Sequence, residues 1–251
     1  MMYIIEMQDV NVNYGRVRAL DNINLKVKEK EFLGIIGPNG GGKTTLLKVL
    51  LGLIKPNSGK VKMQKDIKLG YVPQFTSFNK KFPIRVLDVI LMGKLTKRMK
   101  LLHKYSKKDI QVAEQIMNKL GILEFKNRQI GQLSGGQMQK VLIARSLMID
   151  PDILILDEPT ASLDSNAKND IYQLLKEINS EKTIIMVSHD MGIVSSYIGS
   201  IACVNKQLHY HGDDIHIDEQ EIQEAYGCPI DLITHGTTPH RVLREHKGEE
   251  N

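Results

Sequence analysis

A glycine-rich stretch near the start of the chain has the residue types and spacing of a phosphate-binding loop. The sequence Gly37-Pro38-Asn39-Gly40-Gly41-Gly42-Lys43-Thr44-Thr45 fits the pattern G-x-x-x-x-G-K-[ST]. Glycines let the backbone approach a phosphate closely and turn N–H groups toward it. In this chemistry Lys43 reaches the β- and γ-phosphates of a nucleotide, and the Thr44 hydroxyl binds Mg²⁺.

The segments on both sides of this loop support that interpretation. Residues 32–36 are an apolar run typical of a buried parallel strand, and residues 45–51 are a helix-like apolar stretch that ends at Gly52. A loop between a strand and a helix places the phosphate at a helix N-terminus, which carries roughly half a positive charge. Without these flanks, the same glycines could form a turn that binds nothing.

Two carboxylates follow a second apolar strand further along the chain. Residues 153–156 are Ile-Leu-Ile-Leu, and Asp157 and Glu158 come directly after them. Ligand sites in open α/β sheets lie at this end of the strands, and adjacent residues on a strand point apart. We therefore expect Asp157 to hold the Mg²⁺ shell and Glu158 to polarise the attacking water.

A third glycine-containing motif, Leu133-Ser134-Gly135-Gly136-Gln137, stands at the start of a helical pattern. Ser134 is suited to cap that helix, and the two glycines would expose backbone N–H groups to an anion. A second phosphate-facing element is one interpretation, and a helix cap with no further role is the simpler one.

Three single residues carry little meaning by themselves. Tyr14 ends an N-terminal strand and is either an ordinary strand-end tyrosine or a ring that stacks on adenine. Gln74 lies in a polar loop after a short strand. His189 follows the apolar strand 183–187, a position where histidine is usually structural.

The periodicity elsewhere predicts the elements that must position these groups. Residues 2–12 and 20–27 are expected to form strands, the second of antiparallel type, and residues 60–63 and 67–72 two short strands. From Ile84 to about Leu123 the pattern is helical. Within it, Ser106 and Asp109 resemble a capping box, and Gly121 ends the helix.

Composition narrows the class of protein. The chain has 251 residues, 41% of them hydrophobic, a net charge of +5 and two cysteines, which favours a globular protein in a reducing cytosol. We expect no signal peptide and no membrane-spanning helix.

Residues 94–108 are the most basic segment, either a solvated helix face or a contact for lipid headgroups or an acidic partner loop. Tyr105 is the one Phe, Tyr or Trp among them, so aromatic residues are not interleaved with the basic ones and no nucleic-acid partner is expected.

The C-terminal segment is rich in possible metal ligands. His209 and His211 would share one face of a strand, and His216 follows. One hypothesis is that these three histidines bind a transition metal. The alternative is a solvated, partly helical tail.

These elements in this order resemble the ATP-binding subunit of ABC transporters, from the N-terminus to about residue 210. The residues that carry the resemblance are Tyr14 (A-loop), Gly37 to Thr45 (Walker A), Gln74 (Q-loop), Leu133 to Gln137 (the LSGGQ signature), Ile153 to Glu158 (Walker B and the catalytic glutamate), Ser162-Leu163-Asp164 (D-loop) and His189 (switch histidine). Jointly they make Tyr14, Gln74 and His189 candidates for function.

The resemblance implies an α/β fold: a RecA-like phosphate-loop NTPase core with an antiparallel β subdomain and an inserted α-helical signature subdomain. The ATP-binding domain would span residues 1–210, with the helical subdomain at about 84–150, and residues 211–251 would be a histidine-containing tail. The cofactors implied are ATP and Mg²⁺.

The same resemblance implies a head-to-tail dimer that shares its nucleotides. Each ATP would lie between Walker A of one copy and the signature of the other, where Ser134, Gly135, Gly136, Gln137 and Asp164 complete the site. His189 would contact the γ-phosphate. Gln74 would reach Mg²⁺ and the attacking water, and its loop would meet a membrane subunit.

Two residues depart from the family pattern. Gly41 stands where alanine or serine is more usual, from which we expect slightly less loop rigidity and no change in chemistry. Lys140 stands where arginine is expected; it keeps the charge but loses the planar fork of a guanidinium group.

The C-terminal sequence suggests the cargo. Tyr226-Gly227-Cys228-Pro229, His235-Gly236 and Pro239 to Leu243 look like the ends of zinc/manganese-type ATP-binding subunits. The implied protein is a peripheral ATPase at the cytoplasmic face of the cell membrane, with permease subunits and a separate solute-binding protein as partners.

Three alternatives are open. The first is the ATPase of an importer for an iron chelate, cobalamin or another solute. The second is a soluble ABC ATPase without a transport role, and the third is a scaffold that binds nucleotide without hydrolysis. The single phosphate loop argues against the second and Glu158 against the third.

Overall fold

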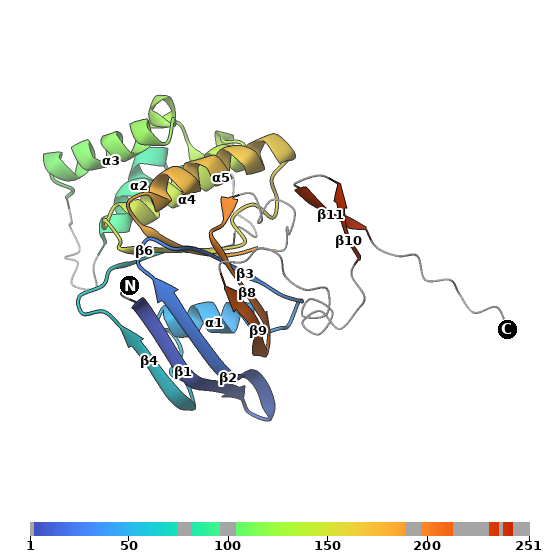
Figure 1. The fold of residues 1–251 in the computed structure, drawn as a ribbon. Helices are drawn as coiled ribbons and strands as arrows, with labels where there is room; N and C mark the ends of the chain where they lie inside the picture. The colour runs from blue at the N-terminus through green and yellow to red at the C-terminus, as the bar shows by residue number, and fades with distance from the viewer. Residues whose placement is uncertain are drawn as a thin grey trace. The chain divides into compact units, whose positions relative to one another are not determined.

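The antiparallel strands predicted at the N-terminus form a three-stranded sheet. The computed structural model describes residues 3–74, 82–95, 104–188, 197–212, 231–235 and 238–242, with the backbone alone from residue 210 onward. Strand β1 (Tyr3–Tyr14) lies between β2 (Val17–Lys28) and β4 (Ser58–Met63) and pairs antiparallel with both (Figure 1). Along the second half of β2 buried and exposed residues alternate, which is the period of two seen in the sequence.

The strand predicted before the phosphate loop is parallel and buried, as expected. β3 (Phe32–Ile36) pairs in parallel with β8 (Ser200–Asn205), which pairs antiparallel with β9 (Gln207–Gly212). After the loop, α1 (Lys43–Leu50) begins, and both β3 and the inner face of α1 are buried. These elements and the antiparallel sheet belong to one compact unit, residues 1–64 with 187–251. Further on, β10 (Asp231–His235) and β11 (Thr238–Val242) form an antiparallel hairpin.

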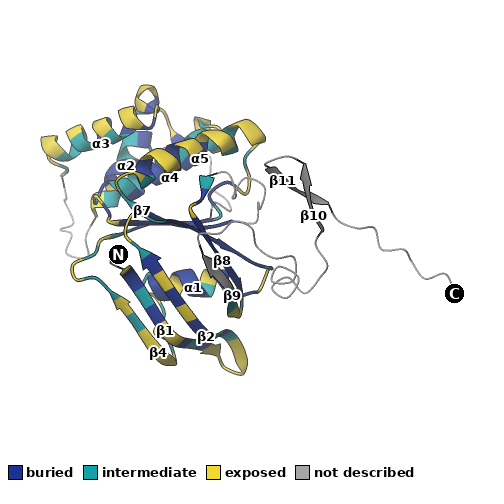
Figure 2. Cartoon of the chain, in the orientation of Figure 1, coloured by how far each residue is buried: buried dark blue, intermediate teal, exposed yellow. Residues whose placement is uncertain are grey.

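Residues 65–186 form the second unit, which contains the other predicted apolar strands. β5 (Leu69–Val72) pairs in parallel with β6 (Ile153–Asp157), and β7 (Thr183–Val187) is the next strand in the order. All five residues of β6 and all five of β7 are buried (Figure 2). Such continuous apolar runs are typical of parallel strands that are covered on both faces.

The helices of this unit are α2 (Val86–Leu91), the 3₁₀ turn η1 (Met92–Lys94), α3 (Lys107–Lys119), η2 (Leu123–Phe125), η3 (Ile130–Gln132), α4 (Gly135–Leu147) and α5 (Ser165–Asn179). α4 packs against α2, α3 and α5. The predicted capping box at the start of α3 is confirmed, because Ser106 and Asp109 exchange side chain–backbone hydrogen bonds. Gly121 follows α3 with a φ of 66°, which is the left-handed conformation expected of a C-terminal glycine.

Among the described residues, the prediction of helical structure continuing from Ile84 to about Leu123 was wrong at residues 84–85, 95 and 104–106. α2 ends at Leu91, and Leu95 is already extended after one 3₁₀ turn. Gly93 lies in that turn, and a Cβ atom there would come within 2.0 Å of the Arg145 carbonyl oxygen. The 3₁₀ turn at residues 92–94 thus packs closely against α4, and hydrophobic periodicity does not report such a contact.

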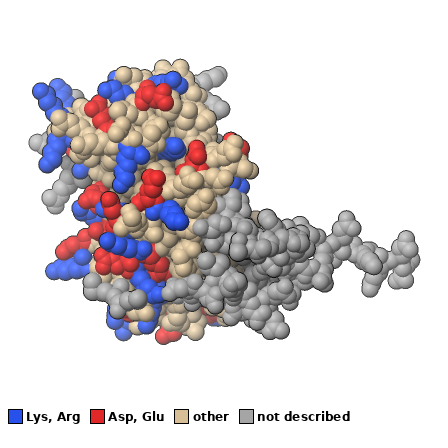
Figure 3. Space-filling model, turned by 45° about the horizontal axis from the view of Figure 1, so that its top comes forward, with Lys and Arg blue, Asp and Glu red and all other residues tan. Residues whose placement is uncertain are grey.

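Charged side chains of both signs share the face of the molecule shown in Figure 3. Among the described residues, no helix is long and apolar enough to cross a membrane. The basic segment predicted at residues 94–108 lies largely outside the described residues, since residues 96–103 are not among them.

Candidate functional site

The phosphate loop encloses the side chain that the sequence singled out for phosphate binding. Lys43 is only 6% exposed, and its ammonium group donates hydrogen bonds of 2.9 Å to the carbonyl oxygens of Gly37 and Pro38. These bonds fold the lysine back over the loop. A cation held at this position is placed to meet an anion that enters the loop.

The helix that follows the loop presents its N-terminus without a side-chain cap. The N-cap residue of α1 is Gly42, which has a φ of 96° and has no side chain that could cap the helix. The first turn of α1 has no acidic residue. Thr44 is exposed and Thr45 half-buried at this end. The N–H groups of a first helical turn and the helix dipole together favour an anion here.

Tyr14 lies in the same unit as the loop, at the end of β1. It pairs with Val17 across the β1–β2 turn, and it is 48% exposed. An exposed ring at a strand end is available for stacking on a planar ligand. Its predicted role as the adenine platform stays a prediction.

In the second unit, the end of β6 holds the first of the two predicted carboxylates. Asp157 is 5% exposed, and the Tyr71 hydroxyl on the neighbouring strand β5 donates a hydrogen bond to it. Burial raises the pKa of Tyr71, and the nearby Asp157 carboxylate raises it further. The tyrosine therefore keeps its proton at neutral pH beside this carboxylate. Sequence reasoning missed Tyr71, because its contact with Asp157 depends on the pairing of β5 with β6.

The second carboxylate has different surroundings. Glu158 is half-buried, its φ is 48°, and its Oε2 atom accepts a hydrogen bond of 2.7 Å from Nε2 of Gln74. The structure thus shows a hydrogen bond between two residues for which the resemblance implied roles at the same attacking water. Asp157 contacts Tyr71 and Glu158 contacts Gln74, so the two adjacent carboxylates diverge as expected.

The signature segment is a capped helix start. Ser134 Oγ accepts a hydrogen bond from the Gln137 N–H, and Gln137 Oε1 accepts one of 3.0 Å from the Ser134 N–H. This capping box confirms the cap predicted for Ser134 and gives Gln137 a structural task that the sequence did not indicate. Ser134 and Gly135 are exposed and accessible to a partner.

A second helix start lies close to the signature. Asp164 caps α5, with its Oδ1 atom accepting a 2.9 Å hydrogen bond from the Ala167 N–H. A cavity of ≈ 290 Å³ is lined by residues of α4 and α5 and of the segment after α3, among them Ser134, Lys140 and Asp170. Asp164 therefore has a structural role beside the nucleotide role predicted for it.

A family model described as "ABC transporter" matches residues 20–161, more than half of the chain. The chain belongs to the ABC transporter family. A Thermotoga maritima protein named "Probable metal transport system ATP-binding protein" is 38% identical over 96% of this chain and 97% of its own length. A zinc uptake system ATP-binding protein of Listeria monocytogenes is 38% identical over 84% of this chain and 86% of its own length. A manganese transport system ATP-binding protein of the same organism is 38% identical over 89% of this chain and 96% of its own length.

Solved structures place this ABC transporter chain in the same fold family. One chain of an ABC transporter in an inward-facing conformation has a TM-score of 0.85 and 27% identity, with 96% of this chain and 97% of that chain covered. An ATP-binding cassette solved as a dimer with ADP and Pi has a TM-score of 0.67 and 29% identity, with 85% and 100% covered. The predicted family and the predicted α/β cassette fold are confirmed.

Three histidines predicted to have a functional role, His189, His211 and His216, fall wholly or partly outside the described residues. His189 and His216 are not described, and only the backbone of His211 is. His209 is half-buried on β9. Within the described part of the chain, no group of three or more His, Cys, Asp or Glu side chains is arranged to hold a metal. The metal hypothesis for the tail therefore stays a prediction.

Proposed function

We propose that this ABC ATPase powers the import of a divalent metal ion, zinc or manganese. The observation that carries the cargo assignment is the similarity, at 38% identity and over most of each chain, to proteins named for metal, zinc and manganese transport. The two features that support hydrolysis are the phosphate loop around Lys43 and the contact between Gln74 and Glu158.

In this proposal the loop residues 37–45 hold the phosphates of ATP, and Tyr14 stacks on the adenine ring. Lys43 leaves its two carbonyl partners to bind the β- and γ-phosphates, as its charge and position favour. The exposed N-terminus of α1 contributes its dipole to the same phosphates.

The donor set fits Mg²⁺, which prefers oxygen ligands: the Thr44 hydroxyl, the Gln74 amide oxygen and the Asp157 carboxylate, the last through water. When bound, Mg²⁺ neutralises charge on the phosphates. Glu158 orients and polarises the attacking water, Gln74 holds that carboxylate, and His189 contacts the γ-phosphate.

A second copy of the chain completes each site in this proposal. Ser134, Gly135, Gly136, Gln137 and Asp164 of one copy face the ATP held by the loop of the other. The similar cassette that was solved as a dimer with ADP and Pi supports this arrangement. The further partners proposed are integral membrane permease subunits and a solute-binding protein, which would place the ATPase at the cytoplasmic face of the membrane. The helical segment at about 84–150 would be the part that moves with the nucleotide, and residues 211–251 would be a separate tail.

Co-purification and metal uptake test the proposal. Tagged Glu158→Gln protein, expressed in the native host and solubilised from membranes with ATP present, should carry a polytopic membrane protein at stoichiometric yield. Cells that lack the chain should lose uptake of zinc or manganese, and the wild-type chain, but not Glu158→Gln, should restore it. Soluble partners alone would favour an ATPase without a transport role. Unchanged uptake of both metals, with loss of iron-chelate or cobalamin uptake, would reassign the cargo.

A further inference from the structure

The phosphate loop lies directly against the turn between β8 and β9. A Cβ atom at Gly37 would come within 2.0 Å of the Val204 carbonyl oxygen, and one at Gly41 within 2.9 Å of the same atom. The Lys206 N–H, in this turn, donates a hydrogen bond of 2.6 Å to the carbonyl oxygen of Gly41. The position of the loop backbone therefore depends on the position of this turn.

The same turn is joined to the antiparallel sheet. Lys206 has a φ of 59°, which is unusual for a residue with a side chain, and its carbonyl oxygen accepts a hydrogen bond of 2.7 Å from the Asp21 N–H on β2. Residue 206 thus contacts the phosphate loop through its N–H and β2 through its carbonyl. Its left-handed conformation is maintained by two bonds to segments that are distant in sequence.

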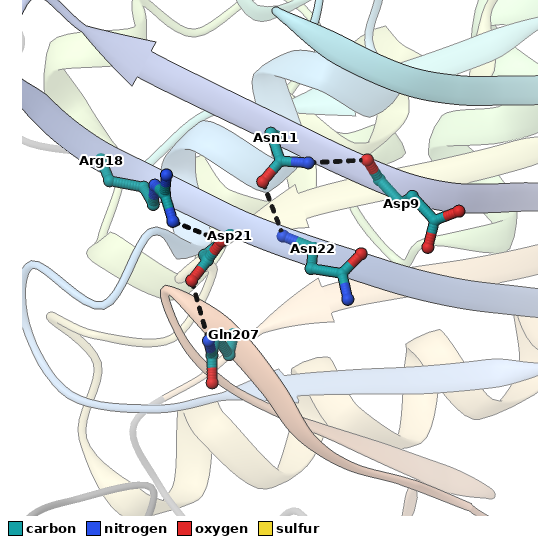
Figure 4. A network of polar contacts seen from close by, with 6 residues as sticks. All are labelled: Asp9, Asn11, Arg18, Asp21, Asn22 and Gln207. Carbon is teal, nitrogen blue, oxygen red and sulfur yellow. Dashed lines mark hydrogen bonds and ion pairs between the residues drawn. The ribbon is translucent and has the colours of Figure 1, made fainter.

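Side chains reinforce this connection. Figure 4 shows Asp21 between Arg18 and Gln207: Oδ2 accepts a bond of 2.8 Å from Gln207 Nε2, and Oδ1 accepts one of 2.9 Å from Arg18 Nη1. The Gln207 bond, with smaller contributions from Arg18, holds the pKa of Asp21 below its usual value, so the carboxylate is charged at neutral pH. Gln207 follows Lys206 directly, so this bond ties the turn to β2 one residue beyond the backbone bond.

We propose that Asp21 and Gln207 are positioning residues for nucleotide binding, which they support by holding the β8–β9 turn against the phosphate loop. Neither side chain belongs to the loop. Their contribution is to keep the Gly41 carbonyl bonded to Lys206, so that the loop N–H groups stay in the arrangement that a phosphate requires. This inference rests on the proposed function, because it assumes that the loop binds ATP.

Equilibrium binding of ATP to three alanine variants tests the proposal. Asp21→Ala and Gln207→Ala should each raise the dissociation constant for ATP by roughly twofold to tenfold, the equivalent of one lost hydrogen bond. The matched control is Asn11→Ala, which removes two hydrogen bonds from the same sheet, to Asp9 and from Asn22, at a site that is not bonded to the turn (Figure 4). Asn11→Ala should destabilise the fold and leave the ATP dissociation constant unchanged.

A donor–acceptor exchange separates positioning from general stability. In the double variant Asp21→Asn with Gln207→Glu, the amide and the carboxylate change places, so ATP affinity should recover relative to either alanine variant. If Asp21→Ala and Gln207→Ala bind ATP as tightly as Asn11→Ala does, the inference is overturned while the proposed function stands. A wild-type chain that binds no ATP would overturn the proposed function and this inference with it.

Discussion

Replacing Gly41 by alanine tests the packing of the phosphate loop. Gly41 is outside the left-handed region, and at such a position alanine normally stabilises a protein by about 0.4–1 kcal/mol, because it restricts the unfolded chain. Here the added Cβ would lie 2.9 Å from the Val204 carbonyl oxygen and 3.0 Å from the Pro38 carbonyl oxygen. Both neighbours are backbone atoms, so the substitution cannot be accommodated by a change of side-chain rotamer.

We therefore expect Gly41→Ala to lower the free energy of unfolding, where a glycine-to-alanine change at such a position normally raises it. Overpacking of this kind destabilises by roughly 1–3 kcal/mol. Gly199 provides the matched control in the same unit: its φ is also ordinary, and an added Cβ would meet only the Phe32 carbonyl oxygen, at 3.8 Å. Gly199→Ala should be stabilising, so the two variants should differ in unfolding free energy by roughly 1.5–4 kcal/mol.

Urea unfolding followed by circular dichroism measures this difference. The urea midpoints of wild type, Gly41→Ala and Gly199→Ala report stability if the dependence of the unfolding free energy on urea concentration is the same for all three. ATP affinity is measured on the folded proteins. Gly41→Ala should also bind ATP more weakly, because the loop must move away from Val204. If Gly41→Ala is as stable as Gly199→Ala or more so, the close packing argued from these contacts is refuted.

Further predictions concern the carboxylate pair and the signature. Glu158→Gln should lower the rate of ATP turnover by a factor of about 10²–10⁴, measured by phosphate release, and should keep its ATP affinity, measured by nucleotide titration. Turnover at the wild-type rate would contradict the role proposed for Glu158. Tyr71→Phe should raise the Mg²⁺ concentration needed for half-maximal ATPase activity roughly tenfold, since Asp157 loses an orienting bond; an unchanged Mg²⁺ requirement would contradict this. Because folding raises the pKa of Tyr71 above its ordinary 10.0, its contribution to stability is full below that pH and is lost as the pH rises through the folded-state pKa. The unfolding free energy of wild type relative to that of Tyr71→Phe should therefore fall as the pH is raised from 9 to 11, and an unchanged difference would contradict this. Ser134→Ala should destabilise by about 1 kcal/mol through loss of the α4 cap, and equal denaturation midpoints would refute the cap's contribution.

The elements predicted best from the sequence are those whose signal is local. The phosphate loop, the buried strands at 32–36 and 153–157 and the caps at Ser106 and Ser134 all depend on residues that are neighbours in sequence. Apolar runs identify buried strands, and serine followed by Asp or Gln three residues later identifies a helix start. The turn around Gly93 was missed, and its close contact is with the Arg145 carbonyl, which is distant in sequence.

The contacts of the candidate site were less accessible to sequence reasoning for the same reason. The residues alone placed Gln74 in a polar loop and Glu158 at the end of an apolar strand, and only the resemblance implied that both act on the attacking water. The pairing of β5 with β6 brings them to hydrogen-bond distance. Tyr71 was not considered, because a tyrosine in a short strand has many possible surroundings. Its hydrogen bond to Asp157 depends on the same strand pairing.

Backbone conformation at two of these positions shows how tertiary contacts override local preference. Glu158 and Lys206 both have positive φ, a conformation that opposes the intrinsic preference of residues with side chains by roughly 1–2 kcal/mol. Each has partners from elsewhere in its own unit: the Glu158 side chain bonds the amide of Gln74, and the Lys206 backbone bonds Gly41 and Asp21. Strain of this kind persists only where the surroundings determine the geometry. Of the seven non-glycine residues with positive φ in the described part of the chain, Glu158 is the proposed catalytic carboxylate and Lys206 supports the phosphate loop. At these two positions the contacts of the surrounding fold help to maintain the geometry proposed for ATP binding and hydrolysis.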